Sequence, residues 1–271
     1  MAREDTLLHK FEEIQIWESP LMKKDEDVLE AFAWEEVMCR QVGLGHRPVA
    51  HLWRHENALV IGLRDRRLKK AEEAMQQFRN KGISTCVRPS GGAAVRLTRG
   101  VVNLSLMLPN PGHAINIHDD FKSMVEYIRK AILPWGGHAV AGEIEGAYCP
   151  GDYDVAINGR KFCGIAQRRL AKAYLVTGFI IVEGSGDELT EDIIQFYDQA
   201  AGDADEGYPQ VRYGSMGSLN ELSGVPSAEA YMQSLIETIG ASAEKVYTGA
   251  RPSVPQSEVE RTVAVLKERY D

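Results

Sequence analysis

An Asn-Gly pair at residues 158–159 is the feature that most constrains how this chain folds. It separates two runs of alternating apolar and polar residues, 154–157 and 161–165. Both central residues of a type I′ turn need positive φ, which asparagine and glycine adopt most readily. The two runs are therefore expected to pair as an antiparallel hairpin. A third run, 173–182, is expected to complete an antiparallel sheet beside them.

The rest of the chain predicts a mixture of helices and strands. Helical spacing or helix-favouring composition marks the segments 25–41, 64–81, 117–132, 188–197, 226–239 and 257–270. Strands are expected at 49–53, 58–63, 101–108 and 246–249. Glu56-Asn57 is the expected turn between the first two of these strands, and Ser218 and Glu221 have the spacing of a capping box. The chain has 271 residues and 44% hydrophobic content, which suits one large domain or one domain with a small helical extension.

The charge balance limits the classes of partner. The net charge is -8, which argues against a general nucleic-acid binder, because such binding depends on neutralising phosphates. Cations nevertheless gather in 64–81, where two interpretations stay open: a solvated helix face, or a docking patch for an acidic partner. The N-terminus is acidic where a secretory signal would be basic, and no apolar run is long enough to span a bilayer. We therefore expect a cytoplasmic protein with reduced thiols and no membrane partner.

The four cysteines, Cys39, Cys86, Cys149 and Cys163, lack the C-x-x-C spacing of zinc and thioredoxin-type sites. Cys149 is followed by Pro-Gly, which indicates a loop, and Lys161 lies across the predicted hairpin. A cation beside a cysteine favours the nucleophilic thiolate. The alternative is a small buried side chain, the usual fate of a free cysteine. Cys163 lies in an apolar strand and is expected to pack there.

Histidine, the usual base for a catalytic cysteine, is absent from the chain after Cys149. A Cys-His pair would need a distant histidine. His51 and His55 lie four apart across a strand end, so hydrogen-bonded or solvated histidines are expected there rather than a metal site. No metal is expected elsewhere.

A glycine-rich turn at Gly91-Gly92 lies between two short predicted strands. Glycine lets backbone approach a ligand closely. The turn is not a P-loop, because no Gly-Lys-Ser/Thr follows, and it lacks the third glycine of a dinucleotide fingerprint.

Three segments together resemble a known family. Residues 88–95 resemble the Arg-x-Ser/Thr-Gly-Gly-Gly-Ala-Val segment of the lipoate–protein ligase and lipoyl/octanoyl transferase superfamily, which shares a catalytic domain with biotin ligases. Residues 158–167 are similar to its Gly-x-Lys segment, and 217–219 to its Ser-Leu signature. The resemblance implies an α+β catalytic domain over 25–250, with mixed, mostly antiparallel sheets packed with helices. An N-terminal arm, 1–24, and a C-terminal helical extension, 251–271, would flank it.

The resemblance also implies a site. Cys149 would carry the acyl group as a thioester, and Lys161 would contact the acyl carbonyl. The residues expected to bind the acyl chain are Arg88, Ser90, Gly91, Gly92, Ala93, Gly164, Ile165 and Ala166. Two departures from the family pattern are Ala93, which replaces the third glycine and is expected to narrow the acyl tunnel, and Arg96, which is expected to serve a partner protein.

The segment 151–169 is most similar to N-octanoyltransferases that move octanoyl from the lysine of glycine-cleavage H protein to lipoyl domains of E2 subunits. A related group that places its cysteine well downstream of the lysine is excluded, because no cysteine follows Cys163. The resemblance implies an amide exchange that needs neither ATP nor a metal. Three alternatives stay open: transfer from octanoyl-acyl-carrier protein to H protein, ATP-dependent lipoate ligation, and a non-catalytic binding module.

Overall fold

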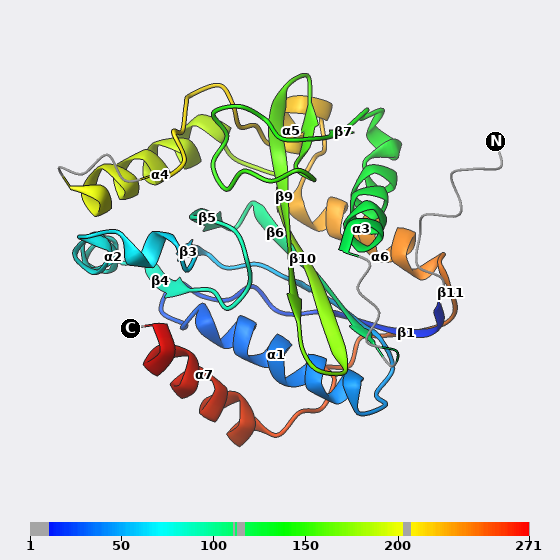
Figure 1. Cartoon of the computed structure of the whole chain (residues 1–271). Helices are drawn as coiled ribbons and strands as arrows, with labels where there is room; N and C mark the ends of the chain where they lie inside the picture. The colour runs from blue at the N-terminus through cyan, green and yellow to red at the C-terminus, as the bar shows by residue number, and fades with distance from the viewer. Residues whose placement is uncertain (1–10, 111, 113–116, 203–206, 271) are drawn as a thin grey trace.

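The computed structural model of the chain describes residues 11–110, 112, 117–202 and 207–270. It confirms the predicted α+β fold, in which helices pack on a large and a small β-sheet (Figure 1).

Within the described ranges the large sheet has eight strands, and most of its neighbours are antiparallel. In their order across the sheet these are β11 (Ala243–Thr248), β1 (Phe11–Glu18), β2 (Val49–Trp53), β6 (Val101–Pro109), β10 (Ala173–Ile181), β9 (Arg160–Arg169), β8 (Val155–Ile157) and β7 (Val140–Ala141). Only β1 pairs in parallel, with β11 on one side and β2 on the other. The sheet is therefore mixed, as the sequence predicts.

The small sheet corrects one prediction. In the part of the chain that the structure describes, its order is β4 (Ser84–Val87), β3 (Asn57–Ile61) and β5 (Val95–Thr98). The predicted pairing of 49–53 with 58–63 through Glu56-Asn57 is wrong, because β2 and β3 belong to different sheets. All five residues of β2 are buried, and its two neighbours are β1 and β6. An apolar run indicates a strand, but not which strand lies beside it.

The helices cover both faces of the large sheet. The longer helices are α1 (Leu29–Gly43), α2 (Ala71–Asn80), α3 (Ile117–Ala131), α4 (Gly186–Ala201), α6 (Ala228–Gly240) and α7 (Gln256–Tyr270), and the short ones are α5 (Leu219–Ser223), η1 (Asp65–Arg67) and η2 (Leu133–Trp135). One face packs under α1, with α7 on its outer side, and the other face packs against α3 and α6. The pair α2 and α4 packs beside the small sheet (Figure 1).

Alternate residues of β6 serve the two faces of the sheet. Leu104 and Leu106 lie in the core under α3 and α6, whereas Met107 lies in the core under α1. Burying each leucine stabilises the fold by about 1.5–3 kcal/mol, and a one-residue slip would turn the whole set to the opposite face, toward α1. The same alternation turns two polar residues, Asn103 and Ser105, toward α1, and both are buried.

Local signals at chain reversals are confirmed. The Asn158 and Gly159 backbones have φ values of 50° and 76°, and the hairpin joins β8 to β9. Ser218 and Glu221 form the predicted capping box at the start of α5.

The predicted helix over 64–81 is wrong in its first half. The Asp65 carboxylate accepts a hydrogen bond from the Gly62 N–H at 2.8 Å, which closes the η1 turn instead. Leu68 is then extended, with ψ of 143°, and α2 begins only at Ala71. A carboxylate that bonds nearby backbone competes with a regular helix.

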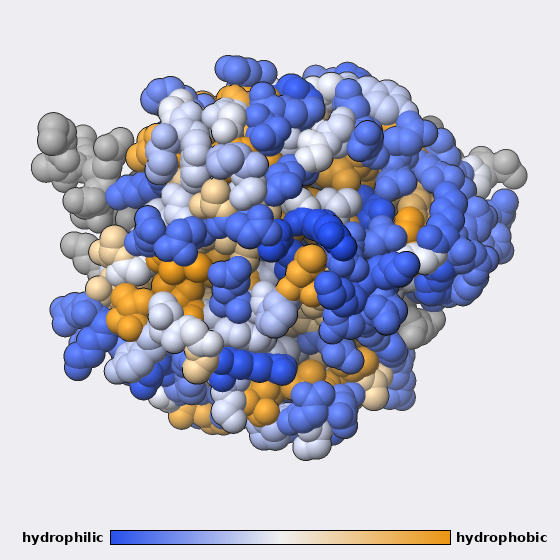
Figure 2. Space-filling model, turned by 180° about the vertical axis from the view of Figure 1, so that it is seen from behind, coloured by the Kyte–Doolittle hydropathy of each residue, from blue (hydrophilic) through white to orange (hydrophobic). Residues whose placement is uncertain are grey.

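Two end segments join the main body. The stretch expected to be an N-terminal arm contains β1, and the expected C-terminal extension contains α7, which packs on α1. Across the described residues, no helix has the length and apolarity needed to cross a membrane. Seen from behind, the surface is mostly hydrophilic, with separate apolar spots (Figure 2).

Candidate active site

A narrow cavity lies between the α1 face of the large sheet and the small sheet, and Cys149 is part of its wall. Of the residues expected to bind an acyl chain, it is lined by Arg88, Ser90, Gly164, Ile165 and Ala166. The sequence predictions missed the rest of the lining, which is Phe32, Glu35, Trp53, Val60, Val95, Leu97, Asn103, Ser105, Thr177, Gly178 and Phe179. For two of these, Asn103 and Ser105, the sequence does carry a signal, because they are polar residues within the otherwise apolar strand β6.

Strand register explains why these residues meet. Two rows of side chains run across four neighbouring strands on the α1 face of the sheet. From β9 to β2, the first row is Gly164, Phe179, Asn103 and Trp53. The second row is Ala166, Thr177, Ser105 and His51. Most of these residues line the cavity, so the sheet forms one of its walls.

Gly164 is required by the ring beside it. A Cβ at this position would lie 2.5 Å from Cε1 of Phe179, which real atoms do not tolerate. The Phe179 ring stacks on Tyr148 with centroids 5.9 Å apart. Gly164 in β9 thus leaves room for the Phe179 ring to stack on Tyr148, the residue before Cys149.

Cys149 has a backbone conformation unusual for a residue with a side chain. Its φ is 50°, in the left-handed region, where non-glycine residues are strained. The side chain is 8% exposed. Two donors reach its sulfur, the Arg88 guanidinium at 3.2 Å and the Ala93 N–H at 3.2 Å. A cation and an N–H aimed at sulfur stabilise negative charge there.

The glycine-rich turn folds over that sulfur instead of lining the cavity wall. Gly92 has a φ of 102°, and a Cβ on it would lie 2.4 Å from Nη2 of Arg88 and 3.0 Å from Sγ of Cys149. Gly91 is exposed. The Ala93 carbonyl accepts a hydrogen bond from the same Arg88 nitrogen that reaches the sulfur. One guanidinium therefore links the turn to the thiol.

Lys161 lies behind the cysteine rather than beside its sulfur. Its Nζ is fully buried and donates to the carbonyls of Tyr148 at 2.9 Å and Cys149 at 2.6 Å. It also pairs with Oδ2 of Asp154 at 2.8 Å. An ammonium has three hydrogens, so contact with an acyl carbonyl would require the exchange of one of these partners. The position of Arg88, not that of Lys161, satisfies the expectation of a cation next to the thiol.

The buried pair has an electrostatic consequence. Burial raises the pKa of Asp154 to about 6, against the opposing effect of the Lys161 charge. Protonation of this carboxyl removes the anion that compensates the buried ammonium.

Further side chains hold the turn from outside. Arg168 donates to the Pro89 carbonyl at 2.8 Å and pairs with Glu36 of α1 at 2.7 Å. The Tyr197 hydroxyl accepts from the Ala94 N–H at 3.3 Å. These contacts link the turn to α1 and α4.

Tyr197 in turn donates to Asp65 at 3.0 Å, and Asp65 holds η1. Burial raises the pKa of Asp65. The same buried polar chain therefore connects the turn over Cys149 to the segment that follows β3.

The expectation that Arg96 serves a partner protein is wrong. The side chain is buried, pairs with Asp192 at 2.6 Å and donates to the Ala58 carbonyl at 3.0 Å. Its charge is used inside the small sheet.

The predicted packing of Cys163 and the predicted hydrogen bonding of His51 and His55 are confirmed. Cys163 is fully buried in the core under α3 and α6, and burial raises its thiol pKa well above the usual value. His51 lies 2.9 Å from Glu35, and His55 lies 3.1 Å from the Glu26 carbonyl. Among the residues that the structure describes, no group of three or more His, Cys, Asp or Glu side chains is arranged to hold a metal.

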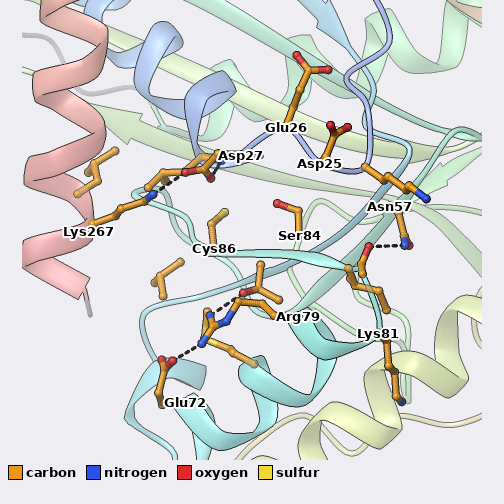
Figure 3. Close-up of a pocket in the computed structure, with 18 of the residues that line it drawn as sticks. Asp25, Glu26, Asp27, Asn57, Glu72, Arg79, Lys81, Ser84, Cys86 and Lys267 are labelled. Carbon is orange, nitrogen blue, oxygen red and sulfur yellow. Dashed lines mark hydrogen bonds and ion pairs between the residues drawn. The ribbon is translucent and has the colours of Figure 1, made fainter.

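A larger hollow, of about 840 Å³, lies away from Cys149 between α2, β4, the segment 24–27 and α7 (Figure 3). Some of its charged side chains pair with one another, as Lys267 does with Asp27 at 2.7 Å. Ser84 and Cys86 of β4 lie along its wall (Figure 3). Many of the side chains in its wall are charged, whereas the cavity beside Cys149 has a mostly apolar wall.

This fold and this cavity define a class of protein. A model of the lipoyl protein ligase A/B catalytic domain matches residues 27–240, so the chain belongs to that family. A crystal structure of lipoate-protein ligase A bound with ATP has the same fold, with a TM-score of 0.70, 18% identity and coverage of 96% of each chain.

Two curated relatives are more specific. "Octanoyl-[GcvH]:protein N-octanoyltransferase" of Bacillus velezensis is 37% identical over 201 residues, 72% of this chain and 70% of the relative. The protein of the same name from Geobacillus kaustophilus is 35% identical over 249 residues, 90% of this chain and 88% of the relative. Within the family, the chain stands among these N-octanoyltransferases.

Proposed function

We propose that this protein transfers an octanoyl group from the lysine of the glycine-cleavage H protein to the lysine of E2 lipoyl domains, through a thioester on Cys149. Its family makes it an N-octanoyltransferase; the proposal concerns the donor, the acceptor and the covalent intermediate. The reaction would take place in the cytoplasm, where thiols stay reduced.

The observation that carries the proposal is the surroundings of one sulfur atom. Cys149 adopts a strained backbone conformation at an apolar cavity, with Arg88 and the Ala93 N–H both 3.2 Å from Sγ. A cysteine that only packs needs neither donor. The apolar walls suit an alkyl chain, and the buried donors suit a charged sulfur or an oxyanion.

The proposed reaction balances without an external energy source. The Cys149 sulfur attacks the amide carbonyl carbon, and a C–S bond replaces the C–N bond. The donor lysine leaves as an amine that carries the proton the thiol gave up. The acceptor amine then attacks the thioester carbon, a C–N bond replaces the C–S bond, and the proton lost by the amine returns to the Cys149 sulfur. One amide is exchanged for another, so ATP has no role in the step.

In this proposal Lys161 is a positioning residue. It holds the Cys149 carbonyl at 2.6 Å, which supports the left-handed backbone that directs Sγ toward Arg88. Arg88 and the Ala93 N–H take the role of stabilising charge on sulfur and then on the carbonyl oxygen.

The test is incubation with octanoylated H protein and an E2 lipoyl domain, without ATP, followed by intact-mass measurement of all three proteins. We expect a hydroxylamine-sensitive octanoyl adduct on this enzyme and octanoyl on the lipoyl domain. Cys149→Ala is expected to lose both. Cys86→Ala, which changes a buried cysteine beside the other hollow, is the matched control and is expected to keep both.

The outcomes separate the alternatives. Acylation by octanoyl-acyl-carrier protein but not by octanoylated H protein would contradict the proposed donor. Transfer that requires ATP and leaves no adduct on Cys149 would indicate a ligase. Full transfer by Cys149→Ala would refute the thioester.

A further inference from the structure

The short segment between β3 and α2 carries an unusual concentration of positive charge. Five of its seven residues from 64 to 70 are cations in a chain of net charge -8. We define as the basic turn the four of them that are exposed and have no side-chain partner within the described part of the chain: Arg64, Arg67, Lys69 and Lys70. The single acid, Asp65, is buried and points inward.

The basic turn is fixed to the loop over the catalytic sulfur. Gly62 packs so tightly on Gly92 that a Cβ would lie 1.9 Å from the Gly92 carbonyl oxygen. A Cβ on Gly92 would in turn lie 3.0 Å from Sγ of Cys149. Asp65 adds a second connection, through the Tyr197 hydroxyl to the Ala94 N–H. The basic turn therefore begins two residues after a glycine that packs on the loop over the thiol.

A solvated surface explains one or two exposed lysines, but not this arrangement. The buried Asp65 carboxylate is used to shape the turn, so it does not neutralise the cations at the surface. Elsewhere in the described part of the chain several exposed cations face acids, as Arg212 does with Glu145 at 2.9 Å. The basic turn keeps its charge available for an external anionic surface.

We propose that the basic turn is the docking surface for an acidic face of the protein that carries the modified lysine. This rests on the proposed function, which requires a folded protein to bring a lysine side chain to Cys149. A cationic surface next to the site attracts a negatively charged partner, and it offsets the repulsion expected from an enzyme of net charge -8.

The test compares two charge reversals of equal size. Arg67→Glu/Lys69→Glu changes the basic turn. Lys245→Glu/Arg261→Glu is the control, and it changes exposed cations on β11 and α7, two elements that lie outside the segment between β3 and α2 (Figure 1). Each variant is assayed for transfer from octanoylated H protein across a range of salt concentrations. Each is also assayed for Cys149 acylation by a small octanoyl thioester.

We expect the basic-turn variant to lose on the order of tenfold in kcat/KM for the protein donor at low salt, through KM. The loss should shrink as salt screens the charges, over a Debye length of about 3 Å at 1 M. Acylation by the small thioester should match the unaltered enzyme, and the control variant should behave like the unaltered enzyme in both assays.

Three results would overturn the proposal: an unchanged kcat/KM and salt dependence in the basic-turn variant, an equal loss in the control, or an equal loss with the small thioester. Failure of the unaltered enzyme to form any octanoyl adduct on Cys149 would refute the proposed function, and this inference with it. The small-thioester assay therefore tells the two failures apart.

Discussion

The most informative perturbation is the removal of the Lys161 ammonium. Lys161→Met keeps a side chain of similar length but leaves the Tyr148 and Cys149 carbonyls without this donor. The buried Asp154 carboxylate loses its cation and keeps the Gly151 N–H as a donor. Breaking a buried pair from one side costs about 3–5 kcal/mol. For a chain of this size that corresponds to a fall in Tm of roughly 6–20 °C.

We expect Lys161→Met to lower the rate of Cys149 acylation by more than the loss of a distant charge would. Without its anchor, the Cys149 backbone can relax from φ of 50°, which moves the sulfur away from Arg88. A displacement of about 1 Å at a reacting atom can lower a rate about 10²-fold. We expect that loss in Cys149 acylation by a small octanoyl thioester, measured below the lowered Tm.

A second variant separates anchoring from charge compensation. Lys161→Met/Asp154→Asn removes the uncompensated carboxylate, so it should recover part of the lost Tm. The two carbonyls still lack a donor, so acylation should stay low. The reasoning is refuted if Lys161→Met acylates within about threefold of the unaltered enzyme. It is also refuted if the double variant recovers acylation together with stability.

Three further predictions concern the same site. Asp154 has its pKa raised to about 6, so its compensating charge is lost as pH falls through that value. The acylation rate should therefore drop below pH 6. Asp154→Asn should be slower overall, and its rate should not fall further below pH 6. The same fall in the variant would mean that another group causes it. Gly164→Ala would place a Cβ 2.5 Å from the Phe179 ring, so a raised KM for the octanoyl donor and a lower Tm are expected, with partial rescue by Phe179→Leu. Unchanged kinetics in Gly164→Ala would mean that the ring moves freely. Arg88→Met removes the cation at 3.2 Å from the sulfur, and acylation should fall about 10²–10³-fold with KM little changed. A loss confined to KM would assign Arg88 to binding alone.

Features that depend on neighbouring residues were determined by the sequence alone. The Asn158-Gly159 hairpin and the Ser218 capping box follow from backbone conformations that few residues favour. The helix α3 follows from apolar spacing, and α7 follows from a helix-favouring composition of mixed charge. The loop position of Cys149 and the packing of Cys163 also followed from their immediate neighbours.

Features that depend on distant residues were decided only by the tertiary structure. Arg88 meets Cys149 across 61 positions of the chain, and nothing local marks that contact. Lys161 was expected beside the thiol, because a hairpin brings it near. Its ammonium instead binds the backbone carbonyls behind the cysteine, since burial leaves it no water and requires every hydrogen to find an acceptor.

The cavity shows the same division. The alternation of β6 already places Asn103 and Ser105 on one face, and that much the sequence determines. Which residues of β2, β9 and β10 stand beside them depends on strand order and register, and these are set by the packing of two sheets and several helices together. The sequence therefore determined the loop of Cys149 and the family's fold, whereas the tertiary structure decided which charge reaches the sulfur.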